Sequence, residues 1–478
     1  MIQITRLLAK QLRSVFKKTI GRQGPALVLT FRSGDDGLFI EAQGTNQALQ
    51  YHDPQPQDRE HLLVPLNVLE DVQGAKAEPV YLNTRRAGVL GASWQDKGMF
   101  RDLEFDAPEP VADAKPFPAM PTQLAENPPT MLAALRDAYE TTDIESNRYA
   151  LGSIQIRGSD GVIAATDGRQ MLKLTGFTFG FDDELLVSHT KFFANKELPD
   201  DQPIRVGKSG GKTVVFQVGH WSYWIGVADG RFPDIDRIIP STQYSNATLQ
   251  LNAADAKFMV DNLHRLPNGV THRELTLDLN GFVILRASSP TTPRPAEIVL
   301  RNSRKQGADV RICTDRKFLA RAAEMGFSEI HLPDNAAPAV ARDATRTFLW
   351  MLLDPKEAIK PTDDCLRIES PFDFGPRASA TATRKETPVN RISSPPPAPV
   401  NPPVSAAIAP AQPVTHRKTA SSASKLASAL DQAIIIRNQL RTTITAVKDL
   451  IRTINIEKRS QKSLKLALAS LKQLQNVA

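Results

Sequence analysis

Cysteine is nearly absent from this chain of 478 residues, which contains only Cys313 and Cys365, and no hydrophobic run approaches the roughly 18 residues that a membrane helix requires. Two cysteines cannot form a disulfide framework, so we expect a reducing, cytoplasmic setting. The eight histidines show no metal-site spacing and no accompanying cysteine pairs. The composition therefore argues against a secreted disulfide-rich protein, a membrane protein and a zinc protein, and we expect no metal or cofactor.

Acidic residues are absent from residues 1–34, and the N-terminus has no apolar core of a secretory signal. Transit peptides are also poor in acids, so composition alone leaves that reading open. The same segment fits an internal repeat, which favours a folded N-terminus.

Charge is unevenly distributed along the chain. Residues 376–478 contain 16 Lys and Arg against 4 Asp and Glu, whereas residues 1–375 contain 43 basic and 48 acidic residues. The body is thus mildly acidic and the C-terminal part strongly basic, which indicates a nucleic-acid or acidic-surface partner for that part.

One hairpin pattern occurs three times, as "LVLTFRSGDDGLFIEA", "SIQIRGSDGVIAA" and "LTLDLNGFVILRA", and these end at Ala42, Ala165 and Ala287. Each has an alternating strand, a turn with Gly, Asp or Asn, and an apolar second strand. The spacings of 123 and 122 residues indicate an internal repeat.

Two further elements recur in the same order. A helical pattern opens each repeat, as "ITRLLAKQLRSVFKK", "PTMLAALRDAYETT" and "NAADAKFMVDNLHRL". A short strand running into a short helix follows later, as "HLLVPLNVLEDVQG", "ELLVSHTKFFANKE" and "DVRICTDRKFLARAAE". The sequence therefore predicts an α+β fold of three similar domains, at 1–120, 121–245 and 246–357.

The composition changes after the third repeat. We expect a disordered Pro/Ala/Ser-rich linker over 358–422, because "RISSPPPAPVNPPVSAAIAPAQPV" cannot form a core. Residues 423–478 carry apolar side chains at heptad-like steps from Leu426 to Ile454, interrupted by Arg437. This pattern predicts a basic amphipathic helical tail, or a marginal helix that folds only on a partner.

Catalysis has little support in the sequence. "VGKSGGKT" at 206–213 looks like a phosphate loop, but Val206 replaces the first glycine and an alternating strand follows where a helix is needed. A Gly-rich hairpin turn is the better interpretation. A nucleotide-hydrolysing enzyme rests on this segment alone.

The first predicted helix carries Arg6, Lys10, Arg13 and Lys17 at steps of four, three and four. These spacings align four cations on one face, which is unfavourable unless an anion faces them. A phosphate backbone would do so without reading base sequence. A solvated surface helix is the alternative.

Three segments resemble one family: "NRYALGSIQIRGSDGVIAATDGRQMLKL" at 147–174, "VADGRFPDIDRIIP" at 227–240, and "TFLWMLLDP" at 347–355. Together with the threefold repeat, they are similar to the bacterial DNA polymerase III beta subunit, the sliding clamp. The resemblance covers about residues 1–357 and is strongest in the second repeat. It implies a DNA-clamp fold in which each domain has outer antiparallel sheets and two inner helices, and two chains close head-to-tail into a ring.

The resemblance also implies two sets of site residues. The DNA-facing set would be Arg6, Lys10, Arg13, Lys17, Arg22, Arg136, Arg148, Tyr149, Lys257, Arg265, Arg316, Lys317 and Arg321. A pocket for short peptides of a DNA polymerase and a clamp loader would be lined by Leu151, Thr166, Gly168, Arg169, Met171, Pro233, Arg237, Ile238, Leu349 and Met351. The alternative for Ile238 and Ile239 is that they cover the junction between the second and third repeats.

The implied function is a non-catalytic processivity factor that encircles duplex DNA in the cytoplasm, at the nucleoid. The chain departs from the family pattern at "DGRQM", at Leu352 where the family has proline, and by more than a hundred further residues. A clamp-fold scaffold or paralogue that acts through its basic tail, without serving the replicative polymerase, is therefore the alternative.

Overall fold

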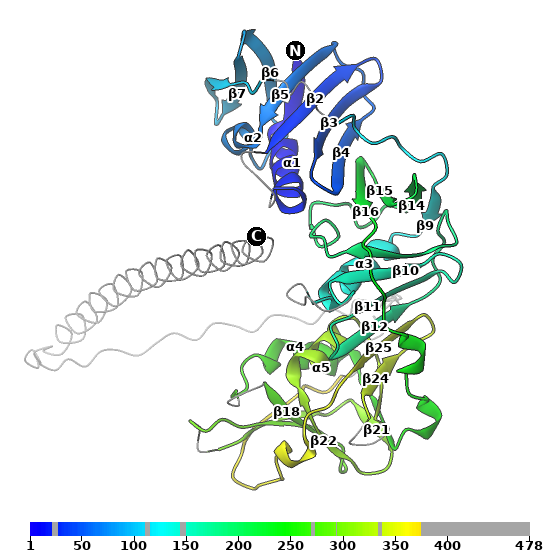
Figure 1. The fold of residues 1–478 in the computed structure, drawn as a ribbon. Coiled ribbons are helices and arrows are strands. Elements are labelled where there is room, and N and C mark those ends of the chain that lie inside the picture. Colours follow the sequence, from blue (N-terminus) through cyan, green and yellow to red (C-terminus); the bar gives the residue numbers. More distant parts are fainter. Residues whose placement is uncertain are drawn as a thin grey trace, which may run out of the picture. The chain divides into compact units, whose positions relative to one another are not determined.

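The computed structural model describes residues 1–21, 27–109, 115–143, 150–268, 273–292, 294–332 and 337–373. All of them belong to a body that spans Met1–Ser379 (Figure 1). The second part, Ala380–Ala478, lies outside the described residues, and with it the predicted helical tail and most of the predicted linker.

Repeat one contains two helices and eight strands among its described residues. They follow one another as β1 (Ile2–Thr5), α1 (Arg6–Thr19), β2 (Val28–Gly34), β3 (Gly37–Gln43), β4 (Gln47–Asp53), β5 (Glu60–Pro65), α2 (Leu66–Val72), β6 (Pro79–Arg86), β7 (Val89–Asp96) and β8 (Met99–Asp106).

Repeat two follows the same order, with one helix among its described residues. Its elements are β9 (Ala125–Asn127), α3 (Thr130–Thr141), β10 (Ser153–Arg157), β11 (Val162–Thr166), β12 (Gln170–Leu174), β13 (Glu184–Ser188), β14 (Ile204–Ser209), β15 (Thr213–Val218) and β16 (Trp221–Gly226). Two 3-10 turns, η1 (Ile235–Arg237) and η2 (Thr242–Tyr244), lie in the connection to repeat three.

Repeat three again has two helices among its described residues. Its elements are β17 (Ala247–Gln250), α4 (Ala253–Leu263), β18 (Glu274–Asp278), β19 (Val283–Ala287), β20 (Ala296–Leu300), β21 (Arg304–Gly307), β22 (Arg311–Asp315), α5 (Arg316–Glu324), β23 (Glu329–Leu332), β24 (Ala339–Arg342), β25 (Arg346–Trp350), the 3-10 turn η3 (Pro355–Glu357) and β26 (Leu366–Glu369). The predicted α+β class and the three repeated hairpins are confirmed, and residues 206–213 form the β14–β15 hairpin rather than a phosphate loop.

Helix α1 shows why the opening segment of a repeat is helical. The Thr5 side chain caps the helix by accepting a hydrogen bond from the Leu8 backbone N–H. One face is buried through Ala9, Leu12, Val15 and Phe16, which join the main core. The other face is left for the lysines. Helices α1 and α2 pack together in repeat one, as α4 and α5 do in repeat three (Figure 1).

The described strands form four sheets, and two of these are built jointly by neighbouring repeats. The eight-stranded sheet has the order β5-β2-β3-β4-β16-β15-β14-β9, so four strands of repeat one continue into four strands of repeat two. The nine-stranded sheet, β13-β10-β11-β12-β25-β24-β23-β17-β21, joins repeat two to repeat three in the same way. Both joints, β4 with β16 and β12 with β25, are antiparallel.

The other two sheets each belong to one repeat. The sheet β1-β6-β7-β8 lies in repeat one and the sheet β22-β18-β19-β20-β26 lies in repeat three. Without β26, each of these sheets corresponds to one half of a jointly built sheet. The strands β22-β18-β19-β20 of repeat three correspond to β5-β2-β3-β4 of repeat one. The strands β1-β6-β7-β8 of repeat one correspond to β9-β14-β15-β16 of repeat two.

The second helix predicted for repeat two is wrong. "ELLVSHTKFFANKE" forms strand β13 and then a series of turns without a helix. Side chains compete with helical hydrogen bonds here: Thr190 accepts from the Phe192 N–H, and Asn195 accepts from the Glu197 N–H. Phe192 and Phe193 are both buried. Two successive side chains of a helix point in different directions, so burial of both residues does not favour a helix that is buried on one face.

The predicted start of the linker at residue 358 is also wrong. The described chain continues along repeat three as far as residue 373 and forms strand β26 on the edge of β20. Backbone and side-chain hydrogen bonds fasten this segment, including one from the Ile359 N–H to the Thr276 hydroxyl.

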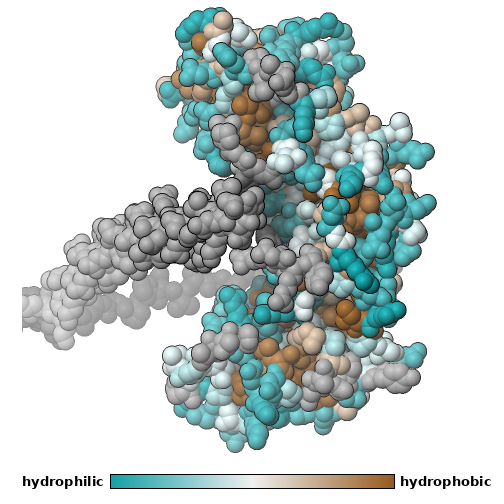
Figure 2. Space-filling view, viewed as in Figure 1, coloured by the Kyte–Doolittle hydropathy of each residue, from teal (hydrophilic) through white to brown (hydrophobic). Residues whose placement is uncertain are grey.

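The surface seen in Figure 2 is largely hydrophilic, with apolar side chains gathered in separate patches. Among the described residues, half of the large hydrophobic side chains that are strongly exposed come from β8 or from β26 and the residues just after it: Met99, Phe100, Leu103, Leu366, Ile368 and Phe372. Strands β8 and β26 each form one of the two edges of their sheet.

Candidate functional site

The cations predicted to face DNA differ in exposure. Five are exposed on or next to helices α1, α4 and α5: Lys10, Lys17, Lys257, Arg265 and Lys317. Lys18, in the last turn of α1, is exposed as well, and the sequence pattern did not single it out because it lies off the face that carries the other four cations. Arg13 and Arg136 are partly exposed, and the Arg13 guanidinium donates to the Glu70 carboxylate at 2.5 Å.

Arg6 is engaged within repeat one, which corrects its assignment to the DNA-facing set. Its guanidinium donates to the carboxylates of Glu78 and Asp96, both at 2.9 Å, and to the carbonyls of Val72 and Gln73. Only 12% of its side chain is exposed. Arg6 therefore ties the start of α1 to the end of α2 and to the β6–β7 sheet.

Arg316 is buried, which removes it from the DNA-facing set. Its Nη1 donates to the Leu263 and Leu266 carbonyls at 3.0 and 2.9 Å, just where α4 ends. The last carbonyl groups of a helix have no hydrogen-bond donor within the helix, so they need donors such as this guanidinium. Burial lowers the pKa of the Arg316 guanidinium.

Arg321 links repeat three to repeat two, which likewise corrects its assignment. Its guanidinium donates to the carbonyls of Asp137 and Glu140 at 2.6 and 2.8 Å, and to the Thr141 hydroxyl at 2.9 Å. These acceptors form the C-terminal turn of α3, so Arg321 of α5 caps a helix of the neighbouring repeat.

Three members of the predicted DNA-facing set, Arg22, Arg148 and Tyr149, lie outside the described residues.

A separate apolar core lies where repeats two and three meet, and we call it the junction cluster. Its buried members are Ala150, Val162, Ala164, Met171, Leu186, Phe232, Ile235, Val340 and Leu349. Two of them, Met171 and Leu349, belong to the predicted peptide pocket and lie opposite each other in the β12–β25 joint.

The turn between β11 and β12 brings further predicted residues to this place. Gly168 has a φ of +86°, which favours glycine, and its N–H donates to the Thr166 hydroxyl at 3.1 Å. A Leu151 methyl carbon lies 4.0 Å from where a Gly168 Cβ would be. The Arg169 carbonyl accepts from the Met351 N–H at 2.9 Å.

The connector at 227–240 packs on the junction cluster. Phe232 and Ile235 are buried members, and Ile239 packs against the cluster. Ile239 thus covers the junction, as the alternative interpretation expected for both isoleucines. Ile238 does not, because 51% of it remains exposed.

Two ion pairs of Asp236, which the sequence motifs did not indicate, hold η1 in position. Asp236 accepts from Lys173 of β12 at 2.5 Å and from Arg157 of β10 at 2.7 Å. These hydrogen bonds, from Lys173 and then from Arg157, lower the pKa of the Asp236 carboxyl. Asp236 is one of three aspartates in the connector 227–240, and nothing in the sequence distinguishes it from Asp229 and Asp234.

The rest of the predicted pocket residues lie at the exposed side of this site. Met351 is 47% exposed, Arg169 and Arg237 are exposed, and Pro233 is partly exposed. Arg237 pairs with Asp234 at 2.9 Å. The arrangement offers two accessible apolar side chains, Ile238 and Met351. Arg237 precedes Ile238 in the chain, and Arg169 is the residue whose carbonyl accepts from the Met351 N–H. Such a site suits an apolar peptide that carries an acid.

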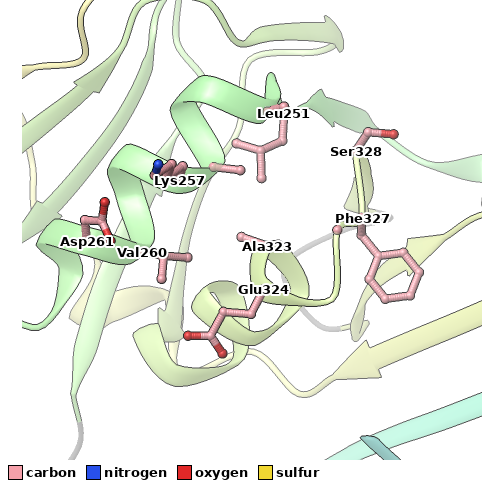
Figure 3. A pocket seen from close by; sticks show the side chains of 11 residues that line it. Leu251, Lys257, Val260, Asp261, Ala323, Glu324, Phe327 and Ser328 are labelled. Carbon is pink, nitrogen blue, oxygen red and sulfur yellow. The ribbon is translucent and has the colours of Figure 1, made fainter. Parts of the chain in front are cut away.

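A hollow of about 330 Å³ lies elsewhere in repeat three, between α4 and the end of α5 (Figure 3). Its walls are mostly apolar, and its charged residues are Lys257, Asp261 and Glu324. Lys257 is the one predicted site residue that lines it.

The described residues contain no group of three or more His, Cys, Asp or Glu side chains that could hold a metal ion. None of the helices in the described ranges is long and apolar enough to cross a membrane. Burial raises the pKa of the Cys313 thiol to about 12, which makes this cysteine a poor nucleophile.

Comparison with known proteins places the fold. No family model and no curated protein matches the sequence. Among solved structures, the chain is similar to a putative DNA polymerase III beta subunit from Eubacterium rectale, with 14% identity over 74% of this chain and 99% of that chain and a TM-score of 0.60.

Two further clamps match over similar lengths. The beta subunit from Streptococcus pyogenes has 12% identity over 73% of this chain and 99% of its own, with a TM-score of 0.62. The subunit from Pseudomonas aeruginosa has 17% identity over 74% and 99%, with a TM-score of 0.59. The chain is therefore a divergent clamp-fold protein, with the fold of the DNA polymerase III beta sliding clamps.

Proposed function

We propose that this protein is a DNA sliding clamp: a non-catalytic ring of two chains that encircles duplex DNA and tethers a DNA polymerase through a peptide site. The proposal combines the clamp fold with three features of this chain, which are its incomplete sheets, its helix cations and the junction cluster.

The incomplete sheets carry the proposal. Repeat one completes a sheet with repeat two, and repeat two does so with repeat three, each time through an antiparallel joint. The half-sheet of repeat three and the half-sheet of repeat one are the two halves that remain. Exposed sheet edges are a liability unless they are covered, and head-to-tail association of two chains covers both.

The exposed lysines support DNA as the molecule inside the ring. Lys10, Lys17 and Lys18 of α1, Lys257 of α4 and Lys317 of α5 offer flexible cations. Within the part of the chain that the structure describes, only Lys317 of these pairs closely with an acid, Asp315 at 3.6 Å. Such cations neutralise phosphates without reading bases, which is what a sliding contact requires.

The junction cluster supports a peptide partner on the same ring. Ile238 and Met351 remain about half exposed beside a buried apolar core, and apolar anchors of this kind dominate peptide affinity. A short linear motif of a polymerase or a clamp loader, with Leu or Phe side chains, is the partner we propose.

The test is the mass of the full-length chain in solution at micromolar concentration, measured by analytical ultracentrifugation and combined with electron microscopy of single particles. We expect two chains in a closed ring. A monomer at every concentration would contradict the ring. A ring that is retained on a nicked circular plasmid and lost after linearisation would establish topological binding.

The strongly basic C-terminal part favours one alternative, a clamp-fold scaffold that binds DNA through this part. In that case DNA binding survives linearisation and disappears when the Lys and Arg residues of 420–478 are replaced by Gln. A topological clamp gives the opposite pair of results.

A further inference from the structure

The clearest feature that the sliding-clamp fold leaves unused is strand β26. It lies beyond the elements that the three repeats share, and it pairs in parallel with β20, with Ala296 opposite Leu366 and Val299 opposite Glu369. The proposal below rests on the ring proposed above and concerns the surface through which the ring closes.

The internal repeat identifies which edge β26 occupies. In repeat one, β4 is the strand that pairs with β16, the last strand of the next repeat, and in repeat two β12 pairs with β25 in the same way. The corresponding strand in repeat three is β20, and the corresponding partner is β8 of a second copy. Strand β26 is hydrogen-bonded to that edge of β20, so β8 cannot pair with β20 while β26 is in place.

Polar contacts fasten β26 to repeat three. The Arg367 guanidinium donates twice to Glu297, at 2.9 and 3.1 Å, and Glu297 is 1% exposed. The Ser370 N–H donates to the Val299 carbonyl and the Ser370 hydroxyl accepts from the Arg301 N–H, both at 2.9 Å.

These contacts favour a strand that stays. Ser370 is 1% exposed and Arg367 is one of the two arginines that pair with the buried Glu297, the other being Arg286. Removing β26 would leave buried polar groups without these partners, which costs more than an ordinary surface contact.

The free edge of β26 has the direction that a second copy requires. Because β26 is parallel to β20, a β8 strand that would be antiparallel to β20 is also antiparallel to β26, roughly 4.8 Å further out. The N–H groups of Leu366 and Ser370 point to β20, so by alternation those of Arg367 and Glu369 point to the free edge.

Both edges also expose apolar side chains. Leu366 and Ile368 of β26 are 60% and 44% exposed, and Phe100 and Leu103 of β8 are 70% and 43% exposed. Strand β26 therefore carries apolar side chains in addition to the charged Arg367 and Glu369, and charge alone would be enough to protect an edge.

We propose that β26 is the third-repeat side of the contact between two copies of this chain, and that β8 of the second copy pairs antiparallel with its outer edge. The composite sheet at this contact then has the order β22-β18-β19-β20-β26 followed by β8-β7-β6-β1 of the second copy.

The test compares Glu369→Pro with Glu369→Ala in the full-length chain. Proline removes an outward N–H that β20 does not use, and alanine keeps it, while both variants lose the exposed Arg301–Glu369 ion pair. We expect Glu369→Pro to raise the dimer dissociation constant by about tenfold or more, and Glu369→Ala to change it less than about threefold.

The outcomes separate the two proposals. A dimer that Glu369→Pro leaves unchanged or strengthens would show that β26 is not the contact strand, and the ring would stand. A monomeric wild-type chain would overturn both.

Cross-linking gives a second measurement of the same contact. Single cysteines introduced along β8, from Met99 to Asp106, are paired with the native Cys365 at the start of β26, because Cys313 is buried. We expect interchain cross-links at one end of β8 and none in the Cys365→Ser background. Absence of cross-links at every position of β8, in a chain that dimerises, would refute the β8–β26 pairing.

Discussion

Truncation of Ile238 and Met351 probes the proposed peptide site directly. We expect the double variant Ile238→Ala with Met351→Ala to bind a synthetic Leu- and Phe-bearing peptide more weakly than the unmodified chain. Both side chains are accessible, with exposed fractions of 51% and 47%, so each has surface left for a partner to cover.

The magnitude follows from that exposure. Complete burial of an aliphatic side chain contributes about 1.5–3 kcal/mol, and a partner can supply about half of it here, or about 1 kcal/mol for each residue. The double variant should therefore lose about 2 kcal/mol of binding free energy, which is roughly a 30-fold rise in Kd.

Isothermal titration calorimetry of the full-length chain with the peptide measures this loss. The matched control is Phe282→Ala, which removes a side chain that is 72% exposed in the β18–β19 turn. Because all three side chains are substantially exposed, the thermal unfolding midpoint should change little in either variant. An unchanged Kd in a folded double variant would refute the assignment of the site.

Three further predictions concern DNA, packing and pH. Replacing Lys10 and Lys17 by Glu should reduce DNA retention, and it should flatten the log–log dependence of DNA affinity on salt concentration by about one unit for each lost phosphate contact. The control Arg59→Glu changes a side chain that is 87% exposed outside the helices, and it should have neither effect. Equal DNA retention by the unmodified chain, the double variant and the control would remove this role. Arg321→Met should lower the free energy of unfolding by about 2–4 kcal/mol in urea titrations, because the α3 carbonyls lose their donors, and an unchanged midpoint would contradict the capping role. Burial raises the pKa of Asp255, but hydrogen bonds from two serines and an asparagine outweigh it and hold this pKa below its ordinary value. The contribution of Asp255 to stability is therefore present above about pH 4 and is lost as the pH falls through the lower, folded-state pKa. The variant Asp255→Asn should therefore make acid unfolding less steep in a fluorescence titration. An identical acid transition in both proteins would argue against this contribution of Asp255.

Local patterns sufficed for much of the fold. The three hairpins, the opening helix of each repeat and the β14–β15 turn follow from alternation, helical period and turn chemistry, which act between near neighbours in the chain. The exposed half of the basic stripe on α1, Lys10 and Lys17, follows from the same period. Ile238 stood out in the sequence as an apolar residue in a connector, and it is exposed in the structure.

The absence of a helix at residues 189–199 of repeat two could not be predicted from repeats one and three. Residues 189–199 resemble the corresponding segments of repeats one and three, but Phe192 stacks on Tyr223 and Phe193 packs edge-on against Phe216. These contacts join positions more than twenty residues apart, and no local pattern reports them. Tertiary packing overrides helical propensity in such cases.

What the sequence by itself determined is the repeat, its hairpins and most of its helices, because these depend on hydrogen bonds and side-chain spacing within short segments. Only the tertiary structure decided the use of the arginines and of the chain after residue 357. The charge pattern cannot distinguish an exposed cation such as Lys317 from Arg316 beside it, whose partners are carbonyls some fifty residues away. Nor can a four-residue strand such as Leu366–Glu369 be recognised locally, since the free edge of β20 and the buried Glu297 are what hold it in a sheet.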